Sequence, residues 1–305
     1  MKRSLRSTVA GLVVLGALLA TAPSDAVGPG SRTAAQHSDG DGDGDGDAKI
    51  VGMAAPADLW SKRIKEVGRC GVEARRIYAW LAPDGKDQAK LIRRSVRAGM
   101  LPVISYKVRN VQTLIDGGYD TWLEKTSDFL DNLNVPVTAT FWHEPYADLD
   151  PADFRAGSWR FVTRMQTTDI SVGPILNGWL LDKKVPEFAS FTSPSLLRKW
   201  DFIAVDSYQS GTAEAPGDLL PARAIPLLAT WLDTQGLPDM PIGLGEYNGH
   251  TGAAIAAAGE TILSTPELWF ALAWNSTTDT YSPLAGDRLT EYQNTKADDR
   301  AKTEC

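Results

Sequence analysis

The sequence has few histidines and cysteines and no concentrated positive charge, and each shortage excludes a class of function. The 305 residues carry a net charge of −7 and contain no run of five or more Lys and Arg, which argues against a nucleic-acid partner. There are only 3 His residues, without the paired spacing of metal ligands, so we expect no metal and no other cofactor. Beyond the N-terminal segment no apolar run is long enough to span a bilayer, so we expect no membrane partner.

The first 48 residues predict a leader and a linker that precede the folded part of the chain. Residues 1–26 begin with basic side chains, continue into a short apolar run and end in small residues, the pattern of a secretory signal peptide. Residues 27–48 include an alternating Asp-Gly tract. Such oxygen-rich tracts can bind calcium, but an EF-hand also needs a closing Glu and flanking helices, so we favour a flexible linker. We therefore expect a secreted monomer whose folded domain spans residues 49–305.

From residue 49 onward, strand-like and helix-like segments alternate. The predicted strands cover residues 49–55, 73–80, 101–107, 135–141, 170–177, 200–208, 240–247 and 268–275. The predicted helices cover residues 56–67, 86–98, 119–133, 151–166, 221–235, 251–263 and 287–296. Eight strands that alternate with helices predict a single-domain (β/α)8 TIM barrel. The alternative, an open doubly wound sheet, normally carries a Gly-rich phosphate loop, and Gly52 lacks the spaced glycine partners of such a loop.

The barrel prediction gives the 2 cysteines, Cys70 and Cys305, a common location. Cys70 lies between the first predicted helix and the second strand, and Cys305 follows the last helix, so both would lie at the bottom of the barrel. In an oxidising compartment such a pair favours a disulfide. The alternative is two unrelated thiols, one of them at the end of the chain.

Chemistry in a barrel of this kind takes place at the C-terminal ends of the strands, and two carboxylates lie there. Glu144 ends the fourth predicted strand beside Trp142 and His143, where burial should raise its pKa and suit it to general acid catalysis. Glu246 ends the seventh strand and could accept bonds from Tyr208 and from basic side chains, which favours the ionised form. A pair of carboxyl groups, one that tends to hold its proton and one that tends to be ionised, is typical of glycosidases. The two groups lie about 5–5.5 Å apart in retaining enzymes and about 6.5–9.5 Å apart in inverting enzymes.

Polar and aromatic residues that could bind a sugar end other predicted strands. This set consists of Trp80, His143, Asn177, Trp179, Tyr208 and Trp274. Aromatic faces stack well on sugar rings, so we predict that these residues contact the substrate and that Trp274 supports a ring. Asp206 should face the same side as Tyr208, where an inward Asp is more often structural than catalytic.

The motifs around these residues resemble glycoside hydrolase clan A, and most closely family 26, the β-mannanase-like group. The motifs on which this resemblance rests are Phe-Trp-His143-Glu144-Pro-Tyr, Phe154-Arg-Ala-Gly-Ser-Trp-Arg, Asp201-Phe-Ile-Ala-Val-Asp-Ser-Tyr, Pro241-Ile-Gly-Leu-Gly-Glu-Tyr and Trp269-Phe-Ala-Leu-Ala-Trp-Asn. The resemblance implies Glu144 as acid/base, Glu246 as nucleophile, His143 and Tyr208 as subsite residues, and Trp274 as a sugar platform.

We therefore predict a secreted retaining glycoside hydrolase that acts on a β-linked polysaccharide or oligosaccharide. The family's strand-four motif usually continues His-Glu-Met-Asn-Gly, whereas this chain has His-Glu-Pro-Tyr-Ala. That difference leaves open an inactive carbohydrate-binding or cell-surface protein on the same barrel. A different hydrolase remains a third possibility, because a fold alone does not fix function.

Overall fold

The structure is a computed structural model that describes residues 48–81, 86–278, 280–303 and 305. The predicted signal peptide and almost all of the predicted linker lie outside the described residues. Among the described helices, none combines the length and the apolar character needed to cross a lipid bilayer.

The described strands form one parallel sheet in the order β5-β4-β3-β2-β1-β9-β8-β7-β6. Their bounds are β1 Ile50–Ala54, β2 Ala74–Trp80, β3 Leu101–Lys107, β4 Val137–Phe141, β5 Ile170–Val172, β6 Ile175–Asn177, β7 Ile203–Tyr208, β8 Ile242–Asn248 and β9 Leu268–Trp274. Each of the eight predicted strands overlaps an observed one, and the predicted fifth strand is split into β5 and β6.

This split closes the ring of strands. β5 pairs with β4, and β6 pairs with β7, so the two ends of the strand order belong to one continuous segment. Between the two halves, the Gly173 amide donates to the Ala139 carbonyl at 3.3 Å, and the Pro174 carbonyl accepts from the Ala204 amide at 2.9 Å. A Cβ at Gly173 would lie 2.2 Å from the Phe202 carbonyl oxygen, so the crossover requires glycine. The (β/α)8 barrel prediction is confirmed.

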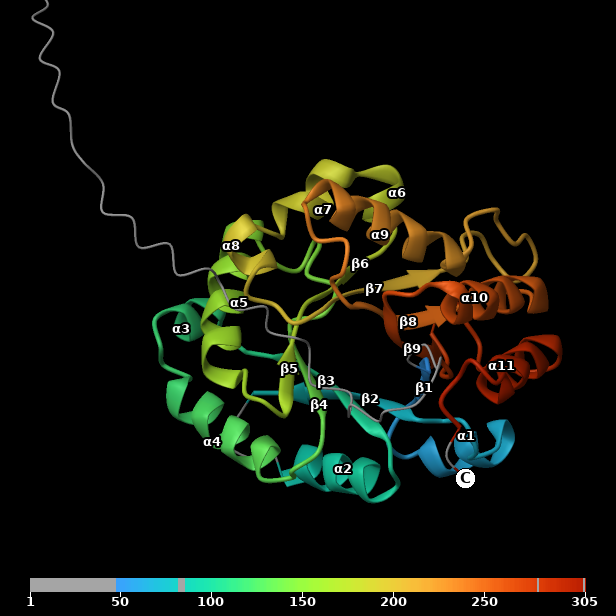
Figure 1. The fold of residues 1–305 in the computed structure, drawn as a ribbon, viewed down its shortest axis with the longest axis horizontal. Coiled ribbons are helices and arrows are strands. Elements are labelled where there is room, and N and C mark those ends of the chain that lie inside the picture. Colours follow the sequence, from blue (N-terminus) through green and yellow to red (C-terminus); the bar gives the residue numbers. More distant parts are fainter. Residues whose placement is uncertain (1–47, 82–85, 279, 304) are drawn as a thin grey trace, which may run out of the picture. The chain divides into compact units, whose positions relative to one another are not determined.

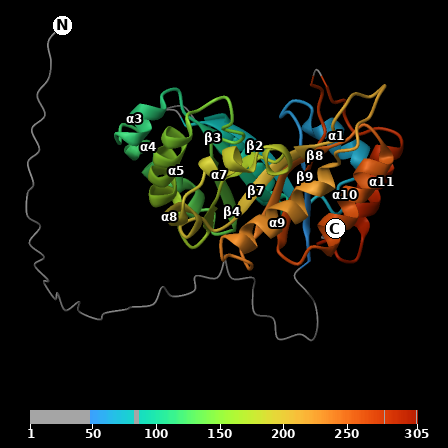
Figure 2. The same cartoon turned by 90° about the horizontal axis from the view of Figure 1, so that it is seen from above.

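Helices surround the strands, as Figure 1 shows. Their bounds are α1 Trp60–Val67, α2 Lys86–Arg97, α3 Val111–Ile115, α4 Asp120–Asp131, α5 Pro151–Met165, α6 Leu180–Lys183, α7 Val185–Ser190, α8 Pro194–Leu197, the 3-10 turn η1 Pro221–Arg223, α9 Ala224–Thr234, α10 Gly252–Ser264 and α11 Asp287–Ala297. In the view of Figure 2, α3 to α5 cover one side of the barrel, and α10 and α11 cover the opposite side. The sequence analysis predicted no helix for α3, α6, α7 or α8.

Side chains that point inward fill the barrel near the N-terminal ends of its strands. Phe202, Phe270 and Val103 belong to a buried apolar cluster there, and none of the three has measurable exposure. Along β2 and β7 the next inward positions are Arg76 and Asp206, because side chains on a strand alternate between its two faces. The barrel floor is thus apolar and the layer above it is charged, which directs polar chemistry to the C-terminal ends.

The end of the chain is held against the bottom of the barrel. Cys70 and Cys305 form a disulfide, and Figure 1 places the C-terminus beside α1. The Lys49 amide donates to the Arg300 carbonyl at 2.9 Å, and the Lys49 carbonyl accepts from the Lys302 amide at 2.9 Å. Both ends of the folded domain are therefore joined at the face opposite the carboxylates.

Candidate active site

The chain turns abruptly where β4 ends, and the turn aims Glu144 into the barrel mouth. Trp142 has φ of 48° and Glu144 has φ of 50°, a left-handed conformation that side chains other than glycine rarely adopt. The strained turn is held by backbone bonds: the Trp142 amide donates to the Tyr106 carbonyl and the Glu144 amide donates to the Ile175 carbonyl, both at 2.9 Å. Strain of this kind costs about 1–3 kcal/mol per residue and concentrates at functional sites.

Glu144 itself is mostly buried and tied to the neighbouring strand. Asn177, at the end of β6, donates from Nδ2 to Glu144 Oε1 at 3.2 Å, and its Oδ1 accepts from the Tyr146 amide at 3.0 Å. Burial, and then the nearby charge of Glu246, raise the pKa of Glu144 from 4.5 to about 7. Around neutral pH this carboxyl group therefore both holds and releases a proton.

A bulge in β8 turns Glu246 into the barrel. Val205 pairs with Leu244, but the next residue, Asp206, pairs with Glu246, so β8 carries one extra residue. A side chain at Gly245 would lie 2.5 Å from Asp206 Oδ1, so Gly245 itself faces the interior. Strict alternation would then send Glu246 outward, and the bulge reverses this direction.

Three side chains hold the Glu246 carboxylate. The Tyr78 hydroxyl donates to Oε1 and the Tyr208 hydroxyl donates to Oε2, so each oxygen accepts one bond. Arg76 Nε lies 3.7 Å from Oε1, within ion-pair distance, and its side chain is fully buried. Hydroxyl donors and a guanidinium are suited to bind a carboxylate, so the three side chains fix the direction of the Glu246 carboxylate.

A charged layer lies beneath Glu246. Burial, and then the charge of Glu246, raise the pKa of Asp206 well above its ordinary value. Burial opposes the charge of Arg76, but Tyr78, Asp206 and Glu246 outweigh it and raise the pKa of the guanidinium. Arg76 therefore remains a permanent cation under the site, and Asp206 keeps its proton more readily than an exposed Asp.

Further polar groups line the same mouth. The His143 ring centroid lies 5.2 Å from that of Tyr78, and burial with the charges of Arg76 and Lys107 lowers the His143 pKa to about 2, so His143 is neutral. The Trp274 ring meets Tyr78 edge-on at 6.4 Å. His143 Nδ1 and Trp274 Nε1 are buried without a hydrogen-bond partner in the described part of the chain.

An aromatic stack supports Tyr208 from behind. Its ring stacks on Tyr281 at 4.7 Å between centroids, and Tyr281 stacks on His250 at 4.9 Å. The Tyr281 hydroxyl donates to the Gln209 carbonyl at 2.5 Å, and Gln209 Oε1 accepts from the His250 amide at 2.7 Å. The loop that follows β9 thereby fixes the direction of the Tyr208 hydroxyl toward Glu246.

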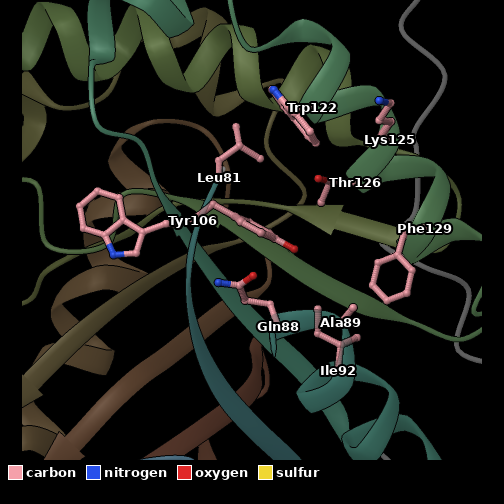
Figure 3. A pocket seen from close by; sticks show the side chains of 10 residues that line it. Leu81, Gln88, Ala89, Ile92, Tyr106, Trp122, Lys125, Thr126 and Phe129 are labelled. Carbon is pink, nitrogen blue, oxygen red and sulfur yellow. The ribbon is translucent and has the colours of Figure 1, made fainter. Parts of the chain in front are cut away.

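The structure brings most predicted site residues together, with one exception. Glu144, Glu246, His143, Asn177, Tyr208 and Trp274 lie around one mouth, and Trp179 lies next to Tyr146 beside it. Trp80 instead lines a separate pocket of about 160 Å³. Figure 3 shows this pocket between α2, which contributes Gln88 and Ile92, and α4, which contributes Trp122 and Phe129.

Two residues of the site escaped the sequence analysis. Tyr78 and Arg76 both point from β2 to Glu246, and neither was among the predicted site residues. They lie two residues apart on β2, so their side chains leave the strand on the same face, but the sequence gives no signal that this face is the inner one. No group of three or more His, Cys, Asp or Glu that could hold a metal occurs among the residues that the structure describes.

Known structures share this barrel. No protein-family model matches the sequence, and a search of curated proteins finds no relative. A modular endo-β-1,4-mannanase from Cellulomonas fimi, of glycoside hydrolase family 26, superposes with a TM-score of 0.59 at 13% identity, over 85% of this chain and 72% of the mannanase. A β-mannanase from Streptomyces thermolilacinus gives a TM-score of 0.52 at 16% identity, over 78% of this chain and 83% of that one.

A third structure has the same architecture. Cel5A from Thermotoga maritima, described in complex with cellobiose, gives a TM-score of 0.54 at 10% identity, over 82% of this chain and 98% of Cel5A. Likeness at this identity shows a common fold, the TIM barrel. The clan A and family 26 resemblance of the sequence motifs is thus accompanied by structural neighbours of the same kind.

Proposed function

We propose that the protein is a retaining glycoside hydrolase that cleaves β-linked glycosidic bonds of a polysaccharide or oligosaccharide, in the manner of a β-mannanase. The observation that carries the proposal is the unlike pair at the barrel mouth. Glu144 has a pKa raised to about 7, whereas the Glu246 carboxylate accepts hydrogen bonds from Tyr78 and Tyr208 and lies within ion-pair distance of Arg76. Glycosidases that proceed through a covalent intermediate require this division of roles.

In the first step, protonated Glu144 gives its proton to the glycosidic oxygen as the bond from that oxygen to the anomeric carbon breaks. Glu246 attacks the same carbon from the opposite face and forms a glycosyl ester. Tyr78 and Tyr208 orient the attacking carboxylate, and the positive charge of Arg76 lies beside it.

In the second step, Glu144 is now ionised and removes a proton from water. The water oxygen attacks the anomeric carbon, the ester bond to Glu246 breaks, and the sugar leaves with the configuration that it had in the substrate. Glu144 regains its proton and Glu246 its charge, so the enzyme returns to its starting state. A pKa near 7 suits Glu144 to both roles, because neither protonation state is strongly disfavoured at neutral pH.

A glycan hydrolysis panel with three variants tests the proposal. Purified protein is incubated with β-mannans, β-glucans and β-xylans, and reducing ends are counted. We expect Glu144→Gln to lower the rate by about 10²–10⁴-fold, and Glu246→Ala to lower it by several orders of magnitude. Glu124→Ala, which removes an exposed carboxylate on α4, is the matched control. Equal rates for wild type and Glu246→Ala would overturn the proposal.

The panel also separates the rival function. An inactive carbohydrate-binding protein would bind one of these glycans without releasing reducing ends over a long incubation.

We further propose that the enzyme acts outside the cell, on the basis of the signal-peptide pattern in residues 1–26. Sequencing the N-terminus of protein recovered from a culture medium tests this, since a retained leader or an exclusively intracellular product would contradict it.

A further inference from the structure

We infer that the site prefers substrates whose leaving-group sugar, immediately beyond the cleaved bond, carries a carboxylate, that is, a uronic acid residue. The inference rests on the proposed function and adds the class of substrate. It is carried by a cluster of Tyr146, Trp179 and Lys184 next to Glu144. We refer to these three residues as the aromatic-lysine cluster.

The cluster combines an exposed Trp ring and a partly buried Tyr ring with one ammonium group. The rings of Tyr146 and Trp179 meet edge-on with centroids 5.2 Å apart, and Trp179 is 43% exposed. Lys184 Nζ lies 5.2 Å from the Tyr146 ring centroid and 5.7 Å from that of Trp179. Exposed aromatic faces bind the apolar face of a sugar ring, and the ammonium adjoins the edge where a ring substituent would project.

Lys184 still has donors to offer a ligand. Its Nζ donates to the Tyr146 hydroxyl at 2.7 Å, which uses one of three N–H groups. The neighbouring acid, Asp182, is bound by Lys183 at 2.7 Å and by Arg223 at 2.6 Å, so it is already neutralised. The hydrogen bond to Tyr146 and, to a lesser degree, the charge of Glu187 raise the pKa of Lys184. Glu187 and Lys184 form no ion pair in the described structure.

The location of the cluster assigns it to the leaving-group side. The amide of Tyr146 donates to Asn177 Oδ1 at 3.0 Å, and Asn177 Nδ2 donates to Glu144 Oε1 at 3.2 Å. Trp179 follows Asn177 by two residues. Glu144 protonates the oxygen that leaves, so the sugar attached to that oxygen lies against residues on the Glu144 side, which are those of the cluster. The other lysine near Glu144, Lys107, already forms an ion pair with Asp148 at 3.0 Å, so it is not counted in the cluster.

Matched substrates isolate the carboxylate. Oligosaccharides with glucuronate or mannuronate at the leaving-group position are compared with their carboxyl-reduced forms, in which only the carboxylate is replaced by a hydroxymethyl group. For each pair, kcat/KM is measured with wild type, Lys184→Met, Lys184→Arg and Lys183→Met. Lys183 is the matched control, because it is an adjacent exposed lysine that is bound to Asp182.

We expect wild type to prefer the uronate member by about twofold to fivefold, the effect of one exposed ion pair. Lys184→Met should abolish this preference, Lys184→Arg should keep most of it, and Lys183→Met should leave it unchanged. Added salt should weaken it, because it screens exposed charges. Equal kcat/KM for the two members in wild type, or a preference that survives Lys184→Met, would overturn the inference.

A binding measurement keeps the two proposals apart. If wild type hydrolyses neither member of any pair, the proposed function fails, and the dissociation constants of the same pairs are then compared by calorimetry. Tighter binding of the uronate member that is lost in Lys184→Met would still support the carboxylate site. Equal dissociation constants in that case would overturn it.

Discussion

Replacing Glu144 with Gln should stabilise the protein at alkaline pH while it removes activity. The substitution keeps the size of the side chain and leaves an oxygen that can accept the bond from Asn177. It removes a carboxyl group whose ionisation is disfavoured by burial and by the charge of Glu246. A functional residue held in an unfavourable state lowers stability, so its neutral replacement should raise the free energy of unfolding.

The size of the effect follows from the pKa of Glu144, which is raised from 4.5 to about 7. A tenfold change in proton affinity is worth about 1.4 kcal/mol, so the ionised group costs the native state about 3 kcal/mol. Below pH 4.5 the native and unfolded states both hold the proton, and there is no cost. Between pH 4.5 and 7 the unfolded state releases its proton first and the cost grows; above pH 7 it is constant.

Chemical denaturation of wild type and Glu144→Gln at pH 4, 6 and 8 measures the difference in their free energies of unfolding. The variant should gain little at pH 4, an intermediate amount at pH 6 and about 2–3 kcal/mol at pH 8. Glu124→Gln, on the exposed face of α4, is the control and should change stability by less than about 0.5 kcal/mol at every pH. A gain at Glu144 that does not depend on pH, or no gain at pH 8, would refute the assigned environment.

Three further predictions concern catalysis and stability. The value of kcat/KM should fall about tenfold per pH unit above about pH 7, because Glu144 must hold its proton to cleave the bond; a flat profile to pH 9 would contradict this. Tyr281→Leu should lower kcat more than it raises KM, because the stack behind Tyr208 is lost, whereas Tyr281→Phe keeps the ring and most of the rate; similar kinetics for the two variants would argue against a positioning role. Cys70→Ser should lower the free energy of unfolding by about 5 kcal/mol, since the disulfide closes a loop of 235 residues; guanidinium denaturation checks this, and an unchanged midpoint would contradict it.

The barrel could be predicted because its strands and helices differ in length, periodicity and end signals. Leu101–Lys107 was predicted with its observed bounds, and Asp150 caps α5, with Oδ1 accepting from the Ala152 amide at 2.7 Å. Asp150 with Pro151 is a strong local signal. The segment between β6 and β7 has a comparable signal only in Ser193 and Pro194 at the start of α8, and α6, α7 and α8 are each only 4 to 6 residues long, too short to show a helical period.

The site was only partly predictable, because side-chain direction depends on neighbouring strands. Arg75 and Arg76 are adjacent, and nothing local decides which one points inward; in the structure Arg75 covers the Trp60 ring at 4.1 Å while Arg76 enters the barrel. Glu246 was placed at the mouth by its position at a strand end. Its actual direction depends on the bulge opposite β7, which is a property of two strands together.

The most direct test of the two-carboxylate account is to trap the covalent intermediate. The protein is incubated with an activated 2-deoxy-2-fluoro glycoside of whichever sugar the hydrolysis panel identifies, and its peptides are weighed by mass spectrometry. The account predicts one fluoroglycosyl group on the peptide that contains Glu246 and none in Glu246→Gln. A label on Glu144 or Asp206, or turnover of the glycoside without any labelled peptide, would contradict it.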